Sequence, residues 1–417
     1  MAESSHTWLH QRNENVRQGV PVNYNFLKLH VLITNRCNFT CGMCSIIHNG
    51  KSTLSESQVR SLIADADELG FDEVEISGGE PYYLPYFKPV IEDYAGKIKP
   101  TVKICTNGYS LDRALIDRLA GRKRLHFQVS FDGTGDVHNA IRVQKRYDAF
   151  SKSEQNFRAL AEAGLSVSLN TVIQRSNVGN ILSTYRHFRD VGYLFHGFNF
   201  VEDGSWDYDK NRLLPDQIDD LVAELETLVA ESKVDGKVVA LESNMISHFK
   251  EMKASGSVVQ DASQFPLHPG YGCTVPFSIA IVHPDGTVVP CFHFSWPNSA
   301  DFNLGQRRLK DIVFSPEYIE RSRRAVQIDG CKGCTTACYF HDPVFRRKCM
   351  HPTAFDLALR DAQRDFLRRR PALALWRGSR LHRALRMFAV RWIGSDAYDS
   401  LRTQIIRLGN GRRATRQ

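Results

Sequence analysis

The sequence lacks two features that would direct it to a membrane. It has no run of about eighteen apolar residues, the length that a helix needs to cross a bilayer. Its start, Met-Ala-Glu-Ser-Ser-His, has neither the basic nor the apolar segment of a secretory signal. These absences exclude an integral membrane protein and predict a cytoplasmic chain.

Lysine is absent from residues 360–417, which hold fifteen arginines and four aspartates. That segment has a net charge of +11, whereas the whole chain has +8, so residues 1–359 carry −3. The basic character therefore belongs to a tail. An anionic partner such as a membrane or a nucleic acid is to be sought there.

Cysteine is scarce, at ten in 417 residues, yet nine of the ten fall in two groups. Disulfides are rare in a reducing compartment, where clustered cysteines indicate metal ligation or redox chemistry. Cys105 stands alone inside a predicted strand, and we expect it to be a small core residue.

The first half of the chain alternates short β-branched segments with amphipathic segments of helical length, which is typical of βα units. Strands are predicted at Leu29–Thr34, Glu73–Ser77, Val102–Thr106, Phe127–Ser130, Ser166–Val172 and Gly197–Val201. Helices are predicted at Ser55–Leu69, Tyr86–Ile98, Asp112–Ala120, Asp148–Ala163 and Asn177–Val191. Six units predict an α/β fold, a partial (β/α)6 TIM-like barrel with its chemistry at the carboxyl ends of the strands.

The predicted domain order places this barrel between other segments. We expect an N-terminal extension at 1–26, the barrel core at 27–205, a helical connection at 206–270, a cysteine-rich module at 271–352 and a basic helical tail at 353–417. Within the module, segments 278–283 and 287–290 flank Pro284-Asp285-Gly286, which predicts a β-hairpin.

Cys37, Cys41 and Cys44 follow the first predicted strand on one loop. Three thiolates at these spacings can hold an iron–sulfur cluster that keeps one iron without a protein ligand, because ordinary clusters use four. They can also hold zinc with a fourth ligand such as His48. The spacing alone leaves both interpretations open.

A second motif, Gly78-Gly79-Glu80, follows the second strand. Its glycines let bare backbone approach a ligand, and Glu80 can accept hydrogen bonds from a cationic amine. Together with the three cysteines, this motif resembles the radical S-adenosylmethionine (SAM) superfamily over roughly residues 27–205.

The resemblance implies that Cys37, Cys41 and Cys44 bind a [4Fe–4S] cluster whose open iron chelates SAM, and that Gly78, Gly79 and Glu80 meet the amine of its methionine. It also implies that an electron from a flavodoxin or ferredoxin type of donor cleaves SAM to a 5′-deoxyadenosyl radical, which abstracts a substrate hydrogen. Met43 departs from the pattern, which usually has an aromatic residue there, although a thioether can pack on a purine.

Later strand ends supply further candidates for SAM binding. Ser130 and Asp132 are candidates for the ribose hydroxyls or the carboxylate, Arg142 for an ion pair with that carboxylate, and Asn170 for the ribose or adenine. The competing interpretation of each is a turn or helix cap. No catalytic residue is assigned.

The second cysteine group is similar to the auxiliary-cluster modules SPASM and twitch. Its members are Cys273, Cys291, Cys331, Cys334, Cys338 and Cys349. The twitch-like assignment uses the first four for at least one auxiliary [4Fe–4S] cluster, and leaves Cys338 and Cys349 as partial ligands of a second cluster or as bystanders. Structural zinc is the alternative.

The tail pattern at 376–393 predicts an amphipathic helix with a basic side, either on an anionic membrane or docked on the barrel. A nucleic-acid role lacks an aromatic platform. About twenty-five residues precede the first strand, too few for the leader-binding domain of many peptide maturases. We therefore expect a small metabolite or carbohydrate-like substrate, with a peptide substrate as the alternative. The competing hypothesis from another functional class is a zinc-binding scaffold protein with a basic tail.

Overall fold

The computed structural model describes residues 28–48, 50–144, 148–201, 207–240, 279–290, 299–305 and 307–327, with short pieces at 246, 249–250 and 253–254. The chain divides into two compact units, 1–353 and 354–417, and every described residue belongs to the first. In these described ranges, no helix is both long and apolar enough to cross a membrane.

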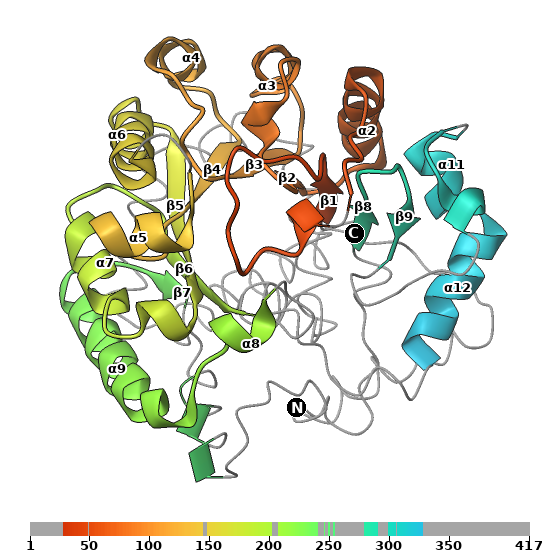
Figure 1. The fold of residues 1–417 in the computed structure, drawn as a ribbon. Helices are drawn as coiled ribbons and strands as arrows, with labels where there is room; N and C mark the ends of the chain where they lie inside the picture. Colours follow the sequence, from red (N-terminus) through yellow and green to blue (C-terminus); the bar gives the residue numbers. More distant parts are fainter. Residues whose placement is uncertain are drawn as a thin grey trace, which may run out of the picture. The chain divides into compact units, whose positions relative to one another are not determined.

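The first part of the fold alternates strands and helices in the predicted order (Figure 1). Its elements are β1 (Lys28–Leu32), η1 (Ile46–His48), α2 (Glu56–Leu69), β2 (Glu73–Ser77), η2 (Pro81–Tyr83), α3 (Phe87–Tyr94), β3 (Thr101–Thr106), α4 (Arg113–Leu119), β4 (Leu125–Ser130), α5 (Gly135–Ile141), α6 (Ala149–Glu162), β5 (Ser166–Ile173), η3 (Arg175–Asn177), α7 (Ile181–Phe188) and β6 (His196–Phe200).

The remaining elements follow the six predicted strands. They are α8 (Tyr208–Asn211), η4 (Pro215–Gln217), α9 (Ile218–Val234), β7 (Val239–Ala240), β8 (Ile279–Val282), β9 (Val288–Val289), η7 (Ser299–Phe302), α11 (Leu309–Val313) and α12 (Pro316–Gln327).

One nine-stranded sheet organises these elements, in the order β7-β6-β5-β4-β3-β2-β1-β8-β9. All neighbours are parallel except the β8–β9 hairpin. The six predicted βα strands and the partial barrel are confirmed. The sequence did not predict that β8 would add to the free side of β1, where Lys28 pairs with Ile279.

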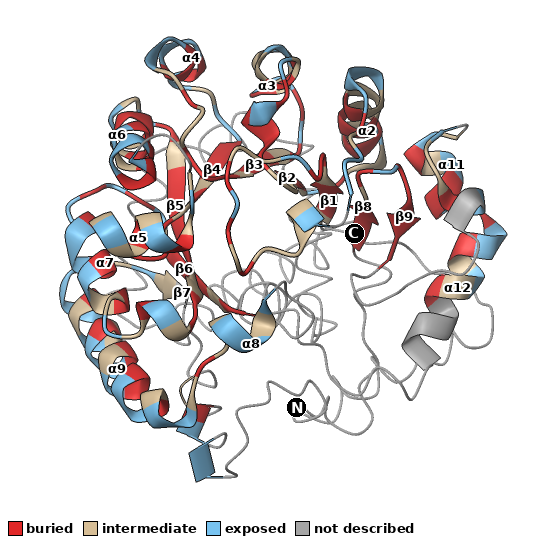
Figure 2. Ribbon diagram, viewed as in Figure 1, coloured by how far each residue is buried: buried red, intermediate tan, exposed pale blue. Residues whose placement is uncertain are grey.

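The two faces of the sheet differ in chemistry. Alternate strand residues such as Leu29, Val74 and Ile104 are buried against the helices that cover the outer face (Figure 2). The inner face is polar instead. Glu75 lies there with Lys28 at 2.7 Å and Lys103 at 3.1 Å, and all three side chains are largely buried. This alternation follows from the two-residue period of a strand.

Helix boundaries follow the capping residues that the sequence offers. The side chains of Ser55, Asp112 and Asp148 each accept a hydrogen bond from the first turn of α2, α4 or α6. The predicted helix Asn177–Val191 is shorter in the structure, where α7 covers Ile181–Phe188. Helix α5 was not predicted, because its seven residues begin at a glycine and show too little periodicity.

Candidate functional site

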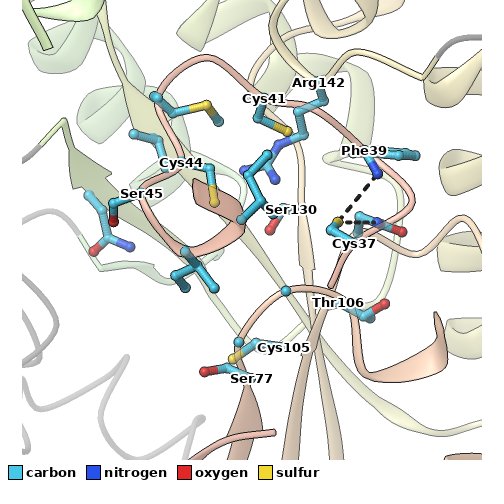
Figure 3. A pocket seen from close by; sticks show the side chains of 18 of the residues that line it. Cys37, Phe39, Cys41, Cys44, Ser45, Ser77, Cys105, Thr106, Ser130 and Arg142 are labelled. Carbon is cyan, nitrogen blue, oxygen red and sulfur yellow. Dashed lines mark hydrogen bonds between the residues drawn. The ribbon is translucent and has the colours of Figure 1, made fainter. Parts of the chain in front are cut away.

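The three cysteines of the first group line one cavity of about 370 Å³ (Figure 3). The loop after β1 carries all three, with Cys41 buried and Cys37 and Cys44 half-buried. The Phe39 N–H donates to the Cys37 sulfur over 3.4 Å, which orients that side chain. The three cysteines that the sequence singled out thus line the same cavity.

Burial makes these thiols hard to ionise while no metal is bound. It raises the pKa of Cys37 to about 12 and that of Cys41 to about 11, although the Arg142 charge opposes the shift at Cys41. Thiolates are the form that binds metal, so loading this site releases protons. Such a pocket favours a bound metal group over free reactive thiolates.

The thiols lie spread around the cavity instead of meeting at one point (Figure 3). Across the described ranges, no group of three His, Cys, Asp or Glu side chains is placed to share a single metal ion. In a cluster each cysteine binds a different iron, so its ligands need not converge on one atom. The donor set of three thiols therefore fits a cluster.

Gly78 and Gly79 line the same cavity at the end of β2. A Cβ added to Gly79 would lie 2.0 Å from the Arg36 carbonyl oxygen, and Gly78 has a φ of +116°. The Gly79 N–H donates a hydrogen bond to the Thr34 carbonyl at 2.6 Å, and the Glu80 N–H donates one to the Arg36 carbonyl at 2.9 Å. These glycines are needed because the cysteine loop passes directly over them.

Glu80 is fully buried behind this glycine pair. Its carboxylate accepts hydrogen bonds from the Thr106 hydroxyl at 2.7 Å, the Asn107 N–H at 2.8 Å and the Tyr82 N–H at 3.1 Å. Burial raises the pKa of Glu80 to about 7, and these donors limit the rise. Thr106 and Asn107 line the cavity, so Glu80 fixes one part of its wall.

Arg142 and Asp132 form an ion pair at the wall, with Arg142 Nε 2.7 Å from Asp132 Oδ2. The Arg142 side chain lines the cavity, whereas Asp132 lies behind it and is buried. The Asp132 carboxylate raises the pKa of Arg142 against the opposing effect of burial. The sequence singled out both residues, and the structure brings them into contact.

The other candidates have different relations to the cavity. Ser130 lines it, while Asn170 accepts a hydrogen bond at 3.2 Å from Asn199, which lines it. Sequence reasoning missed Asn199, which follows a glycine in β6 and has no motif around it. It was wrong about Cys105, which is half-buried and lines the cavity because its place in β3 turns it to the inner face.

The second cysteine group lies outside the described residues, as do the tail and most of the helical connection after 240. The predicted hairpin is confirmed in β8 and β9. Its turn has Gly286 at a φ of +87° and a hydrogen bond from the Thr287 N–H to Asp285 at 2.9 Å.

Comparison with known families assigns two regions of the chain. Residues 31–187 match the radical SAM superfamily, and residues 273–335 match SPASM, an iron–sulfur cluster-binding domain. These domains bring a [4Fe–4S] cluster with SAM, and at least one auxiliary iron–sulfur cluster. These two matches replace the alternative interpretation of the cysteine groups as zinc sites of a scaffold protein.

Among curated relatives, the mycofactocin maturase MftC of Mycobacterium tuberculosis is 33% identical over 153 residues, 36% of this chain and 38% of the relative. The PqqA peptide cyclase of Granulibacter bethesdensis is 34% identical over 153 residues, again 36% of this chain and 40% of the relative. This chain thus spans well under half the length of both. The AdoMet-dependent heme synthase of Methanosarcina barkeri is 23% identical and covers 74% of this chain and 90% of its own.

A solved structure with the same fold is Streptococcus suis SuiB bound to S-adenosylmethionine. It superposes with a TM-score of 0.57 at 16% identity, covering 76% of this chain and 73% of SuiB. The family matches agree with the cysteine loop, the glycine pair and the partial barrel described above. The chain therefore carries a radical S-adenosylmethionine domain at residues 31–187 and a SPASM iron–sulfur cluster-binding domain at residues 273–335.

Proposed function

We propose that this enzyme is a maturase that modifies a peptide through radical chemistry. The observation that carries the proposal is the agreement of its relatives, which include a peptide cyclase and a mycofactocin maturase. SuiB, which shares the fold, has also been crystallised with the precursor peptide SuiA. These likenesses favour the peptide alternative over the small-metabolite substrate that the sequence suggested.

A small-molecule substrate remains the second candidate because of the heme synthase, whose similarity extends over more of this chain than that of the maturases. The residues that line the cavity are mostly uncharged, a chemistry that suits a peptide and a small molecule alike. Isotope transfer from a labelled substrate distinguishes the two.

In the proposed site, Cys37, Cys41 and Cys44 hold the cluster, since all three thiols line one cavity. When bound and reduced, the cluster supplies the electron that cleaves SAM and generates the radical that removes a substrate hydrogen. A flavodoxin or ferredoxin type of protein is the proposed donor. The protein's own part is to fix the cofactor and keep water out.

The wall residues divide the binding of SAM among them. Gly78 and Gly79 offer bare backbone to the methionine amine, and Glu80 lies behind them. A carboxylate has about four acceptor positions, and three donors reach that of Glu80. One position is thus left for the amine, whose positive charge would favour the ionised form of Glu80.

The carboxylate and ribose of SAM are assigned to other residues of the cavity wall. Arg142 pairs with the carboxylate, because its guanidinium lines the cavity and is fixed by Asp132. Ser130 faces the ribose, and Asn170 acts there through Asn199. Met43 lines the cavity and packs on the adenine.

Auxiliary iron is assigned to the second cysteine group. Cys273, Cys291, Cys331 and Cys334 are the proposed ligands of one cluster. Cys338 and Cys349 are left as partial ligands of a second cluster or as bystanders. An auxiliary cluster would accept an electron from the oxidised substrate.

The experiment compares peptide and small-molecule substrates directly. Anaerobically loaded protein is incubated with SAM, dithionite and precursor peptides encoded next to its gene, and both 5′-deoxyadenosine and peptide mass are measured. A mass change in one peptide, with deuterium passing from that labelled peptide to 5′-deoxyadenosine, supports the maturase. Deuterium transfer from a labelled small metabolite, with every peptide unchanged, would overturn it.

A further inference from the structure

The ion pair of Arg142 and Asp132 is arranged so that its two charges differ in their distance from the cavity. Among the described residues that line the cavity, Arg142 is the one whose side chain carries a full charge. Asp132 is 1% exposed and does not line the cavity. The positive member therefore faces the space between the cysteines, and the negative member lies behind it.

Both partners are held in place by the surrounding backbone. Asp132 Oδ1 accepts a hydrogen bond from the Val172 N–H at 2.8 Å, and the Asp132 carbonyl accepts one from the Asn177 side chain at 3.0 Å. The Arg142 N–H donates to the His138 carbonyl at 2.7 Å as α5 ends. Hydrogen bonds therefore hold the backbone at both residues, and the contact with Asp132 Oδ2 orients the guanidinium.

The guanidinium also lies beside one of the three thiols. Figure 3 shows Arg142 next to Cys41 on the wall of the cavity, and its charge acts on both Cys41 and Cys44. The reduction potential of an iron–sulfur cluster depends on nearby charge, hydrogen bonds and solvent exposure. A fixed positive charge favours the state that holds one more electron, and a fixed negative charge opposes it.

We propose that Arg142 and Asp132 are positioning residues that together set the reduction potential of the cluster at Cys37, Cys41 and Cys44, with Arg142 raising it and Asp132 lowering it. The inference rests on the proposed ligand role of those cysteines. It goes beyond carboxylate binding by Arg142, because the effect is present before SAM arrives. Loss of the Arg142 charge should therefore lower the reduction potential, and loss of the Asp132 charge should raise it.

The test is a potentiometric titration of the loaded full-length protein, followed by electron paramagnetic resonance and performed without SAM. The signal of this cluster is identified by its loss in the Cys37→Ala, Cys41→Ala, Cys44→Ala triple variant. We expect Arg142→Gln to lower the potential and Asp132→Asn to raise it. Each shift should change the ratio of reduced to oxidised cluster about tenfold at fixed potential, or about 59 mV for one electron.

Arg113→Gln is the matched control. It removes an arginine charge from an exposed ion pair with Asp117 on α4 and should leave the potential unchanged. Shifts of the same sign in Arg142→Gln and Asp132→Asn, or none in either, would overturn the proposal, because a structural role alone gives no opposite signs.

Two further outcomes are separable. If Arg142→Gln fails to hold iron, Asp132→Asn decides alone, and an unchanged or lowered potential in that variant overturns the proposal. Failure of the parent protein to modify any peptide would count against the maturase and leave the measured potentials valid.

Discussion

The carboxylate of Asp65 in α2 accepts a hydrogen bond at 3.0 Å from the Leu309 N–H, 244 residues further along the chain. Leu309 begins α11, and Arg308 forms an ion pair with the same carboxylate. Asp65 is fully buried. A barrel residue therefore supplies the acceptor for a backbone N–H in the first turn of α11, a helix that lies between two cysteines of the second group in the sequence.

This contact predicts the effect of Asp65→Ala. The change leaves the Leu309 N–H buried without its acceptor, which costs about 1–3 kcal/mol. We expect the free energy of unfolding, measured with denaturant, to fall by that amount. Asp93→Ala, which breaks an exposed ion pair with Arg60, is the control and should cost under about 1 kcal/mol. Equal losses in the two variants would contradict the role of Asp65.

Gly79→Ala tests the crossing of the cysteine loop. The new Cβ would meet the Arg36 carbonyl oxygen at 2.0 Å, so the backbone before Cys37 must move. We expect the variant to bind less than half of the parent's iron at the first site, measured as loss of the SAM-responsive resonance signal. Gly192→Ala has no atom within 4 Å of its Cβ and should retain full loading. Normal iron loading of Gly79→Ala would contradict this prediction, because it would show that the cysteine loop can move to accept the Cβ without losing the site.

The cluster assignment is tested by the triple variant Cys37→Ala, Cys41→Ala, Cys44→Ala. It should lose the formation of 5′-deoxyadenosine while iron remains in the second group. The measurements are chromatography of the nucleoside product after dithionite reduction and iron analysis. Product formation at the parent rate would refute the assignment.

His126 predicts a dependence of stability on pH. Its ring nitrogens lie 2.8 Å from the hydroxyls of Ser166 and Ser168, and burial lowers its pKa to about 3. Above its ordinary pKa near 6.5 both folded and unfolded states hold it neutral, so its stabilisation is complete. As pH falls from about 6.5 toward 3, the unfolded state takes up the proton first. The free energy of unfolding then falls, by up to about 1.4 kcal/mol per pH unit.

His126→Gln should flatten that acid slope while lowering stability at neutral pH. Denaturant unfolding between pH 4 and 7 measures both effects. An unchanged slope would mean that the buried ring does not control the acid sensitivity.

The arginine tail remains a prediction from the sequence alone. If its amphipathic helix binds an anionic surface, the protein should sediment with phosphatidylglycerol vesicles at low salt and less at high salt. Deleting residues 371–417 should abolish sedimentation and leave SAM cleavage intact. Insolubility or loss of iron after deletion would show instead that the helix is part of the folded core.

Local signals in the sequence located the elements well where a residue type has a direct physical effect. Ser55, Asp112 and Asp148 cap helices at the predicted starts, and Pro284-Asp285-Gly286 forms the predicted turn. The cysteine and Gly-Gly-Glu motifs correctly placed two strand ends at one cavity.

Long-range relations were beyond the reach of such signals. The addition of β8 to β1, the Asp65 contact and the approach of Arg36 to Gly79 all depend on how distant segments pack. Cys105 was misassigned because a residue within a strand can face either side, and the inner face of this barrel is polar. Register, which no single residue reveals, decides such cases.

The pairing of Lys28 with Ile279 also affects how the chain folds during synthesis. A ribosome adds roughly 5–20 residues per second, so the partner of β1 is made about 12–50 s after β1 itself. Throughout that interval one side of β1 presents unpaired N–H and C=O groups, which invite pairing with other chains. Slow translation or a late truncation before β8 should therefore promote aggregation of the nascent barrel.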